Sequence, residues 1–361
     1  MPYGGLMGDI LTKVVRVDTI NPDQEAIKEA AELILEGKLV AFPTETVYGL
    51  GADATNAIAV KRIFEAKLRP ADNPVIVHIA SFEQLYEVAS EIEEKIVELA
   101  KVFWPGPFTI IVKKSSQIPN EVSAGLPMVA VRMPAHPVAI ALIKTSRRPI
   151  AAPSANLSGR PSPTKAEHVL EDLGGRIDMI LDAGETLFGV ESTIIDLTKR
   201  PPRLLRPGPL VVEDIERVAG KIEVSDISRA EIKYDGIAEA PGTKYRHYAP
   251  KAPMTLVEGP QESRFKTALS LVNERLKKGV RVGVLTTSEN YERYPKGAVV
   301  LAAGSSNEPY SIAHNLFSVL REFDRIGVEE IIAEGVEMKG IGFTIMNRLR
   351  KAAGHNIVRA E

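Results

Sequence analysis

Residues 254–286 read MTLVEGPQESRFKTALSLVNERLKKGVRVGVLT, a short apolar run, a long amphipathic stretch and a second apolar run. The same alternation of apolar runs and helical stretches continues toward the end of the chain, at 298–302, 310–326, 330–334 and 342–353. Strands that alternate with helices in this way pair in parallel within one sheet. We therefore expect residues 251–361 to form a small Rossmann-like domain.

The part of the chain before residue 220 also mixes strands and helices, but without strict alternation. One helix is predicted to begin at Asn21-Pro22 and to end at Gly37, because Asn is a favoured N-cap, Pro fits the first turn and Gly ends helices. Such a mixture favours an α/β domain built on a twisted mixed sheet. The periodicity weakens over residues 221–250, which we interpret as a linker.

Composition restricts the function. The chain has 361 residues, 44% of them hydrophobic and 25% charged, which is enough apolar material for two cores. It has no cysteine, which excludes disulfides, Cys-type zinc sites, iron–sulfur clusters and a thiol nucleophile. The net charge of −2 gives no global attraction to nucleic acid or to an anionic membrane. With no long apolar run and no signal-peptide pattern, we expect a cytoplasmic protein without a membrane role.

A polar segment, PTETVYGLGADAT at residues 43–55, follows the predicted strand 39–42. It is rich in Gly and Thr, so we expect a loop in which hydroxyls such as that of Thr46 hold a small polar ligand, with a purely structural turn as the alternative. Residues 49–54, GLGADA, also match G-x-G-x-x-A. Because they do not stand in the first turn after the strand, a dinucleotide site is disfavoured.

Two cations stand at the start of the segment KLRPADNPVIVH, residues 67–78. Lys67 and Arg69 could simply cap the preceding helix, but the prolines of the loop stiffen it and fix both charges. Two fixed cations suit a polyphosphate, which Arg binds as a fork and Lys as a point charge. His78 falls on the next predicted strand, where a structural histidine and a ligand contact both fit the pattern.

Arg132 stands in an otherwise apolar predicted strand, residues 129–132. A guanidinium in such a strand needs an anionic partner, because an unpaired buried charge is costly. That partner is either an Asp or Glu of the protein or the carboxylate of a substrate. The sequence leaves both open.

Small and hydroxyl-bearing residues follow a further strand in the segment APSANLSGRPS, residues 152–162. Its backbone N–H groups and Ser hydroxyls could hold phosphate oxygens, although it is not a Walker loop. Ser192 and Arg206 stand at later strand ends. Cations and hydroxyls gathered on one face, without a thiol nucleophile, a carboxylate pair or a metal-ligand motif, predict a site for a polyanion and a small acid. Catalysis there would rest on positioning and charge stabilisation.

Seven segments together resemble the threonylcarbamoyl-AMP synthase family, whose core is the YrdC-like domain. Between residues 43 and 208 they are, in order, PTETVYGLG, KLRPADNPVIVH, PGPFTIIV, VRMPAHP, APSANLSGRPSPT, ESTIID and LLRPG. KYRHYAP at residues 244–250 and the Rossmann-like end resemble the long, two-domain form of the family. The resemblance implies a YrdC-like catalytic domain, a linker that acts as a lid and a C-terminal domain, at residues 1–220, 221–250 and 251–361.

The resemblance also implies an activity. It is that of a nucleotidyltransferase that condenses L-threonine, bicarbonate or CO₂, and ATP into threonylcarbamoyl-adenylate, pyrophosphate and water. Mg²⁺ would help as a clamp on the phosphates. The adenylate would be handed to a separate tRNA threonylcarbamoyl transferase complex, which forms N6-threonylcarbamoyladenosine. Whether this chain itself binds tRNA is left open.

The matching motif positions imply the residues of the site. Around threonine the resemblance places Thr46, His78, Arg132, Ala152 (through its backbone) and Ser192, with Arg132 on the carboxylate. Around ATP it places Lys67, Arg69, Asn73, Met128 (through its backbone), Ser154, Asn156, Ser162, Arg206 and Tyr245. Lys67 and Arg69 would stabilise charge, and Tyr245 would reach back from the linker and keep water from a labile mixed anhydride. The motifs identify neither a general base nor a protein ligand for a metal.

Two other functions fit parts of the pattern. A carbamoyl transferase of the hydrogenase-maturation type shares the YrdC-like domain, but it also carries Cys zinc fingers, and this chain has no Cys. An RNA-binding module without activity would use the cationic residues alone. The pI of about 6.4 disfavours such a module, and RNA binding does not require the segment KYRHYAP.

Overall fold

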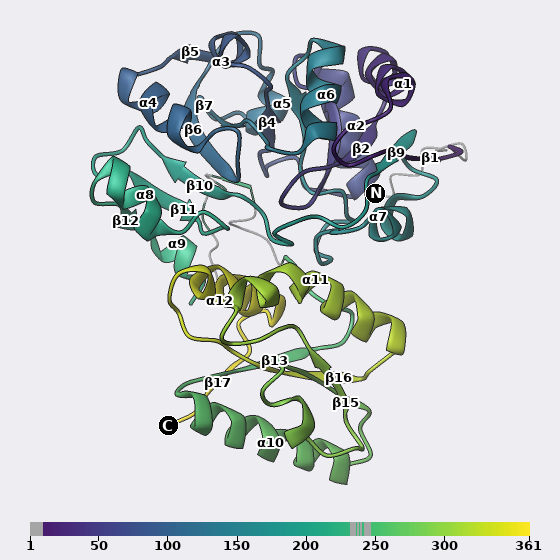
Figure 1. Ribbon diagram of the computed structural model, residues 1–361, viewed down its shortest axis with the longest axis vertical. Helices are drawn as coiled ribbons and strands as arrows, with labels where there is room; N and C mark the ends of the chain where they lie inside the picture. Colours follow the sequence, from purple (N-terminus) through teal and green to yellow (C-terminus); the bar gives the residue numbers. More distant parts are fainter. Residues whose placement is uncertain (1–9, 232–235, 237, 239, 242–246) are drawn as a thin grey trace. The chain divides into compact units, whose positions relative to one another are not determined.

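The computed structural model describes residues 10–231, 236, 238, 240–241 and 247–361 (Figure 1). The chain divides into two compact units. The first unit runs to Ser158 and resumes over Pro163–Thr186, and the second comprises Gly159–Ser162 and Leu187–Glu361. The boundaries of these units differ from those of the domains expected at 1–220 and 251–361. The expected domain boundaries stay a prediction.

A mixed sheet forms the centre of the first unit. Its strand order is β1-β9-β2-β3-β8-β4-β7-β6, with β5 added beside β6. β9 pairs in parallel with β1 and β2, whereas β3 is antiparallel to both β2 and β8. The expected mixed α/β sheet is therefore confirmed. Its strands are β1 (Lys13–Arg16), β2 (Val40–Pro43), β3 (Tyr48–Asp53), β4 (Ile76–His78), β5 (Ala89–Glu91), β6 (Phe108–Lys114), β7 (Met128–Arg132), β8 (Ile150–Ala151) and β9 (Met179–Asp182).

Helices of the first unit cover this sheet. They are α1 (Gln24–Leu35), α2 (Ala57–Lys67), α3 (Phe82–Val88), α4 (Glu94–Phe103), α5 (Asn120–Ser123), α6 (Pro137–Ser146) and α7 (Ala166–Leu173). α1 and α6 pack on each other and against β2, and their apolar side chains share one core with those of β2 and β9. Ile34 and Leu142 are fully buried there. Each such side chain contributes about 1.5–3 kcal/mol by leaving water.

The start of α1 differs from the prediction. The N-cap is Asp23 rather than Asn21, and its side chain accepts a hydrogen bond from the backbone N–H of Ala26 at 2.9 Å. Asn21 instead belongs to a turn that Asp18 organises, because its N–H donates to Asp18 Oδ1 at 2.7 Å. A carboxylate three residues before an N–H is a favourable cap, so the helix begins after Asp23.

β3 corrects the expectation of a loop over residues 43–55. All six of its residues are buried, and it pairs with β2 through Phe42↔Gly49 and Val40↔Gly51. The glycines allow this packing: a Cβ on Gly51 would lie 2.7 Å from Phe42 Cε1. GLGADA is thus a buried strand and not a phosphate-binding turn.

The second unit contains a small sheet and a larger one. In the small sheet β11 pairs antiparallel with β10 and parallel with β12. Strand ends at Ser192 and Arg206 were predicted from the sequence, whereas β12 was not. Its elements are β10 (Thr193–Asp196), β11 (Arg203–Arg206), α8 (Val212–Ala219), β12 (Glu223–Val224) and α9 (Asp226–Arg229).

The larger sheet has the order β15-β14-β16-β13-β17, and its pairs are parallel. This confirms the predicted Rossmann-like domain and adds one strand, β17. Every residue of β14 is buried, as continuous apolar strands of parallel sheets are. Its elements are β13 (Met254–Glu258), α10 (Gln261–Lys277), β14 (Val282–Thr286), the 3₁₀ helix η1 (Tyr291–Arg293), β15 (Val299–Ala302), α11 (Pro309–Ile326), β16 (Glu330–Glu334), α12 (Ile341–Ala352) and β17 (Ile357–Arg359).

No helix in the part of the chain that the structure describes combines the length and the apolar composition that a bilayer crossing requires.

Candidate functional site

The predicted site residues fall in both units. Ten of them belong to the first unit: Thr46, Lys67, Arg69, Asn73, His78, Met128, Arg132, Ala152, Ser154 and Asn156. Three belong to the second unit: Ser162, Ser192 and Arg206. Tyr245 lies outside the described residues.

Three neighbouring strands of the first unit bring the expected threonine residues together. β4 and β7 run in parallel with His78 opposite Arg132. β8 lies antiparallel on the other side of β4, with His78 opposite Ile150. Ala152 follows β8, and its N–H donates to Ile76 O at 2.9 Å. His78, Arg132 and Ala152 therefore stand close to one another across three strands.

The Arg132 side chain is almost fully buried, with 3% exposed. Its Nη1 donates to Thr46 Oγ1 at 2.9 Å, and its Nε donates to the carbonyl of Gly106 at 3.1 Å. Its Nη2 lies 2.6 Å from Oε1 of the buried Glu45. Glu45 is thus the protein carboxylate that the sequence left as one of two alternatives.

Glu45 itself was not selected from the sequence. Its other oxygen, Oε2, accepts from the N–H of Ala135 at 3.0 Å, so it also fixes the chain just after β7. The available signal was an acid between two threonines in a segment already chosen for its chemistry.

Thr46 is held by a turn that a neighbouring threonine organises. Thr44 Oγ1 accepts from the N–H groups of Thr46 and Val47 at 3.1 and 3.3 Å. The Thr44 and Thr46 hydroxyl oxygens lie 2.8 Å apart. Because Thr46 also receives the Arg132 hydrogen bond, its hydroxyl has a defined position next to the guanidinium.

Lys67 closes α2 and is buried, with 1% of the residue exposed. Its Nζ donates to the carbonyls of Ser154 and Asn156, and its own carbonyl accepts from the N–H of Ser158 at 2.9 Å. The cation therefore ties the helix end to the segment after β8. This brings Lys67, Ser154 and Asn156 together, as the motif positions implied.

Arg69 organises its own loop. Its Nε donates to the Asn73 carbonyl at 3.2 Å and its Nη2 to the Pro74 carbonyl at 2.9 Å. Asn73 is buried, and its Oδ1 has no hydrogen-bond partner among residues that the structure describes. A buried amide oxygen without a partner is costly, so it marks a position where a ligand donor would be favourable. Met128 opens β7, where it lies opposite Lys113.

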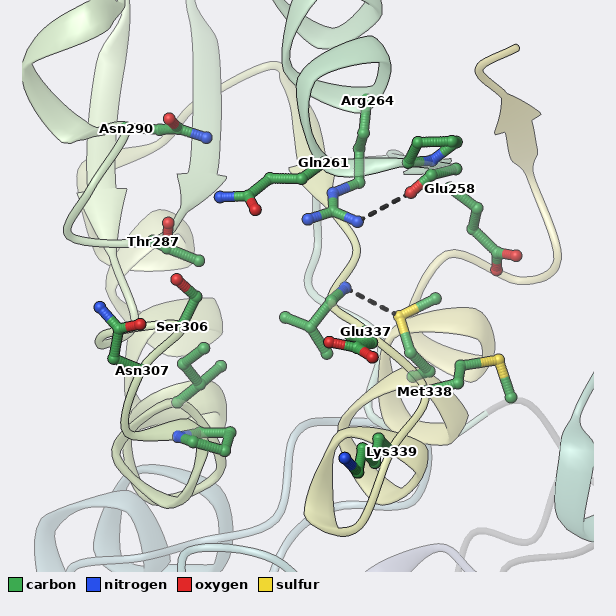
Figure 2. Close-up of a pocket in the computed structure, with 16 residues that line it drawn as sticks. Glu258, Gln261, Arg264, Thr287, Asn290, Ser306, Asn307, Glu337, Met338 and Lys339 are labelled. Carbon is green, nitrogen blue, oxygen red and sulfur yellow. Dashed lines mark hydrogen bonds between the residues drawn. The ribbon is translucent and has the colours of Figure 1, made fainter.

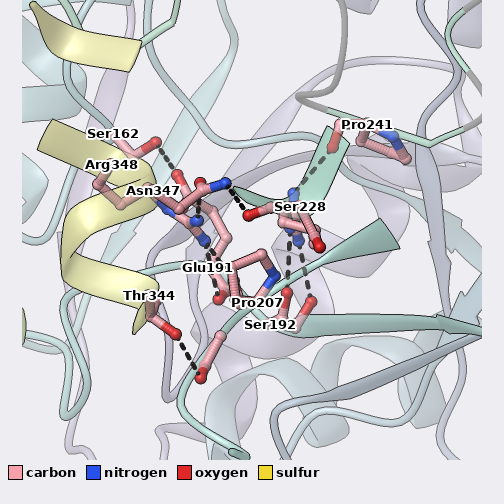
Figure 3. A network of polar contacts seen from close by, with 11 residues as sticks. Ser162, Glu191, Ser192, Pro207, Ser228, Pro241, Thr344, Asn347 and Arg348 are labelled. Atoms are coloured by element: carbon pink, nitrogen blue, oxygen red, sulfur yellow. Dashed lines mark hydrogen bonds and ion pairs between the residues drawn. The ribbon is translucent and has the colours of Figure 1, made fainter. Parts of the chain in front are cut away.

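A buried polar network in the second unit joins the other predicted residues (Figure 3). The Ser162 hydroxyl donates to Glu191 Oε1, and Arg348 Nε donates to Glu191 Oε2 at 2.8 Å. Arg206 donates to Ser192, through Nε to the carbonyl at 3.0 Å and through Nη2 to the hydroxyl at 3.1 Å. Since Glu191 and Ser192 are adjacent, one network holds Ser162, Ser192 and Arg206.

The charge of Glu191 is set by its partners. Burial raises the pKa of this carboxyl, but the guanidinium groups of Arg348 and Arg206 outweigh that effect and hold its pKa below the ordinary value. The Arg348 side chain has 0% exposed and that of Glu191 8%. The pair is therefore a buried ion pair whose members depend on each other.

α12 supplies Arg348 and two more polar contacts to the chain after β11. Thr344 Oγ1 donates to the Gly208 carbonyl at 2.9 Å, and Arg348 Nη2 donates to the Pro207 carbonyl at 3.0 Å. The sequence prediction missed Arg348. The signal was its helical spacing from Ile341 and Ile345, which puts a cation on the apolar face of α12.

Known proteins resemble this chain over nearly its whole length. Residues 32–208 match the family described as Telomere recombination, and residues 210–354 match the one described as Threonylcarbamoyl-AMP synthase, C-terminal domain. A Pyrococcus abyssi protein named threonylcarbamoyl-AMP synthase is 54% identical over 333 residues, 92% of this chain and 95% of that protein. A Bacillus subtilis protein of the same name is 48% identical over 347 residues, 95% of this chain and 97% of its own.

Solved structures also resemble this chain. The crystal structure of P. abyssi Sua5 complexed with L-threonine has a TM-score of 0.91 and 52% identity, and it covers 97% of this chain and 100% of that chain. E. coli YciO, at 24% identity, has a TM-score of 0.50 and covers 55% of this chain and 96% of its own. That second likeness concerns the fold alone.

Proposed function

This chain belongs to the threonylcarbamoyl-AMP synthase family, and we propose that the side chains gathered in its first unit bind the family's substrates. The chain is an enzyme of the nucleotidyltransferase type that makes threonylcarbamoyl-adenylate for the threonylcarbamoyladenosine modification of tRNA. The observation that carries the site assignment is the buried group Arg132–Thr46, beside His78 on the adjacent strand.

The reaction that we propose has two bond-forming steps. The threonine amine takes up carbon dioxide, which bicarbonate supplies with loss of water, and forms a carbamate. A carbamate oxygen then attacks the α-phosphorus of ATP, and the bond to the β-phosphate breaks as pyrophosphate leaves. Such a transfer needs positioning and charge stabilisation more than a protein nucleophile.

Threonine binding is assigned to Arg132, Thr46, His78 and Ala152. Arg132 is a forked cation with a fixed orientation, which suits a carboxylate. Its Nη2 lies 2.6 Å from Glu45 Oε1. We propose that the threonine carboxylate joins Arg132 from the side of the Thr46 hydroxyl, with Glu45 retained as the internal counter-charge.

ATP binding is assigned to Lys67, Arg69, Asn73, Met128, Ser154 and Asn156. Lys67 and Arg69 hold the two loops that carry the remaining polar groups. A phosphate chain that approached these loops would meet two cations and several backbone N–H groups. The roles of Ser192 toward threonine, and of Ser162, Arg206 and Tyr245 toward ATP, stay predictions from the motif positions.

The proposal also covers the carbon source, the place of the reaction, the fate of the product and the role of Mg²⁺. Bicarbonate supplies the carbamoyl carbon, the reaction runs in the cytoplasm, and the product passes to a separate complex that modifies tRNA. Among the described residues no three His, Cys, Asp or Glu side chains gather as metal ligands. Mg²⁺ often binds through one or two carboxylates plus substrate phosphates, so we propose that it enters with the triphosphate of ATP.

Pyrophosphate release tests the assignment. The full chain is incubated with ATP, with and without L-threonine and bicarbonate, and L-serine replaces L-threonine in a control. We expect release that requires both L-threonine and bicarbonate and is much slower with L-serine. Release that persists without L-threonine would mean hydrolysis or carbamoyl chemistry instead. No release from a folded chain that binds ATP would favour a binding module.

A further inference from the structure

A cavity of 690 Å³ opens in the second unit, away from every residue assigned above (Figure 2). Its walls are the segments that follow β13, β14, β15 and β16, which contribute residues such as Arg264, Asn290, Asn307 and Glu337. These segments lie at the carboxyl ends of parallel strands, where open α/β sheets bind ligands. The volume is that of a pocket for a small organic molecule.

Arg264 is the buried cation among the residues that line this cavity. It stands in the first turn of α10 and is 9% exposed. Its Nη1 donates to the Gly259 carbonyl at 2.9 Å, whereas its buried Nε has no hydrogen-bond partner among the described residues. Figure 2 shows the guanidinium directed into the pocket, beside Gln261 and above Glu337. A buried cation so placed favours an anion in the cavity.

A protein carboxylate near Arg264 does not take that place. Glu334, at the end of β16, accepts hydrogen bonds from Asn290 Nδ2 at 3.0 Å, from the Tyr294 hydroxyl at 2.9 Å and from the Thr286 hydroxyl. No hydrogen bond or ion pair joins it to Arg264 in the described part of the chain. The carboxylate is therefore satisfied by other donors, and the Arg264 guanidinium keeps donor capacity for a ligand.

Three long helices begin at the same cavity. α10, α11 and α12 start just after its wall segments, and none of the three has a side-chain hydrogen bond at its N-cap. The first turn of α10 therefore keeps its positive partial charge, whereas the Ser311 N–H of α11 and the Gly342 N–H of α12 donate to the carbonyls of Glu308 and Lys339. A helix N-terminus in the state of α10 is a favourable site for a phosphate group.

The rest of the lining is amphipathic. Gln261 and Asn307 offer amides, and Val336, Met338 and Met346 offer apolar surface. Glu258 is held by Arg350 at 2.7 and 3.0 Å, which leaves Glu337 as the acid available to a ligand. A carboxylate at this edge of a sheet can accept hydrogen bonds from ribose hydroxyls.

We propose that this cavity is a second ligand site that takes a nucleoside monophosphate. The phosphate lies on Arg264 and the N-terminus of α10, the ribose hydroxyls on Glu337, and the base against the methionines. A dinucleotide is disfavoured because the turn after β13 carries a single glycine. A Cβ on that Gly259 would lie 2.3 Å from the Ala360 carbonyl oxygen, so this glycine serves the packing of the chain end.

Site-resolved hydrogen exchange of the full chain tests the proposal. AMP is the probe, and inorganic phosphate and L-threonine are the comparison ligands. We expect AMP to slow exchange at least threefold over 259–266, 304–312 and 336–346, whatever it does in the first unit. Equal protection by inorganic phosphate would overturn the nucleoside part, and protection by L-threonine alone would overturn the whole assignment. The measurement follows exchange in these three segments alone. Its outcome therefore does not depend on whether the proposed reaction in the first unit is correct.

Variants locate the effect. Lys339 is an exposed cation in the lining of the same cavity. Arg264→Gln and Lys339→Gln should each reduce the AMP protection, and misfolding is not expected for Lys339→Gln because the residue lies on the surface. Arg281→Gln, at the opposite end of β14, is the matched control and should leave the protection unchanged. Full AMP protection in folded Arg264→Gln and in Lys339→Gln, or no protection in the wild type, would overturn the site.

Discussion

Arg132 combines a structural role and a proposed binding role in one buried side chain. Arg132→Lys retains the charge but loses the planar fork that reaches Glu45, Thr46 and the Gly106 carbonyl together. We expect the affinity for L-threonine to fall about tenfold or more, a loss of about 1.4 kcal/mol or more. The affinity for ATP should change little. Calorimetric titration of both ligands measures this difference.

Arg148→Lys is the matched control for that experiment. Arg148 is half exposed, and its Nε lies 3.5 Å from the Asp53 carboxylate on the surface of the same unit. The control should bind both ligands as the wild type does. An unchanged L-threonine affinity in Arg132→Lys would remove Arg132 from the threonine site.

Lys351 makes stability depend on pH. Burial lowers the pKa of this amine from 10.5 to about 7, Arg348 and Arg206 add to the effect, and Glu191 opposes it. Above pH 7 the unfolded chain therefore holds more protons than the folded one, so stability increases as the pH rises. From pH 7 to pH 9 this group should add about 2 kcal/mol. Urea unfolding at both pH values should show a smaller increase for Lys351→Met than for the wild type. An equal increase would contradict the account.

α12 is the element that stabilises the buried network of the second unit. Arg348→Met leaves the Glu191 carboxylate buried without its cation, and loss of one partner of such a pair costs about 3–5 kcal/mol. The double variant Glu191→Gln/Arg348→Met removes both charges and should recover part of the loss. Urea unfolding of the wild type, both single variants and the double variant gives the coupling energy.

A surface pair provides the comparison for this cycle. Lys278 and Glu274 lie 2.6 Å apart on α10, and both are exposed. Lys278→Met should cost less than about 0.5 kcal/mol. A similarly small cost for Arg348→Met would mean that the Glu191 pair does not stabilise this unit.

β3 depends on two glycines that bring it close to β2. Gly51→Ala would place a Cβ 2.7 Å from the Phe42 ring and 2.9 Å from Ile150 Cγ2. Overpacking of this kind costs about 1–3 kcal/mol. At Gly297 a Cβ would lie 3.5 Å from Leu276, an ordinary contact, so Gly297→Ala should be nearly neutral. Thermal unfolding of both variants compares the two positions, and equal melting temperatures would contradict the packing role of Gly51.

The two units differ in how far their elements could be predicted. The parallel strands of the second unit follow from continuous apolar runs separated by amphipathic stretches, which are local signals. β3 was not predicted because it has glycines at positions where apolar side chains usually indicate a strand. β17 and β12 were not predicted, because they have only three and two residues.

The residues of the site, like the strands, could be predicted only where a local sequence signal marked them. Motif segments located Arg132, Thr46 and Lys67, but the partner of each depends on contacts between distant parts of the chain. Glu191 and Arg348 stand 157 residues apart in sequence, and no local pattern pairs them. The N-cap of α1 was misplaced by two residues because the competing turn at Asp18 could not be seen.

At the scale of the whole molecule, the family assignment covers both units. The first family match ends at residue 208, and the second runs from residue 210 to residue 354. The second unit is therefore part of the enzyme as the family builds it. We infer that its network around Glu191 holds Ser162 and Ser192 in fixed positions, whatever each then contacts.

The central claim is the reaction itself, and the identity of its product tests it most directly. The full chain is incubated with ATP, L-threonine and ¹³C-bicarbonate, and the nucleotide products are analysed at once by mass spectrometry. The account predicts a threonylcarbamoyl-adenylate that carries one ¹³C from bicarbonate and forms only when L-threonine is present. A nucleotide product limited to ADP or unmodified AMP, with no labelled adenylate, would contradict it.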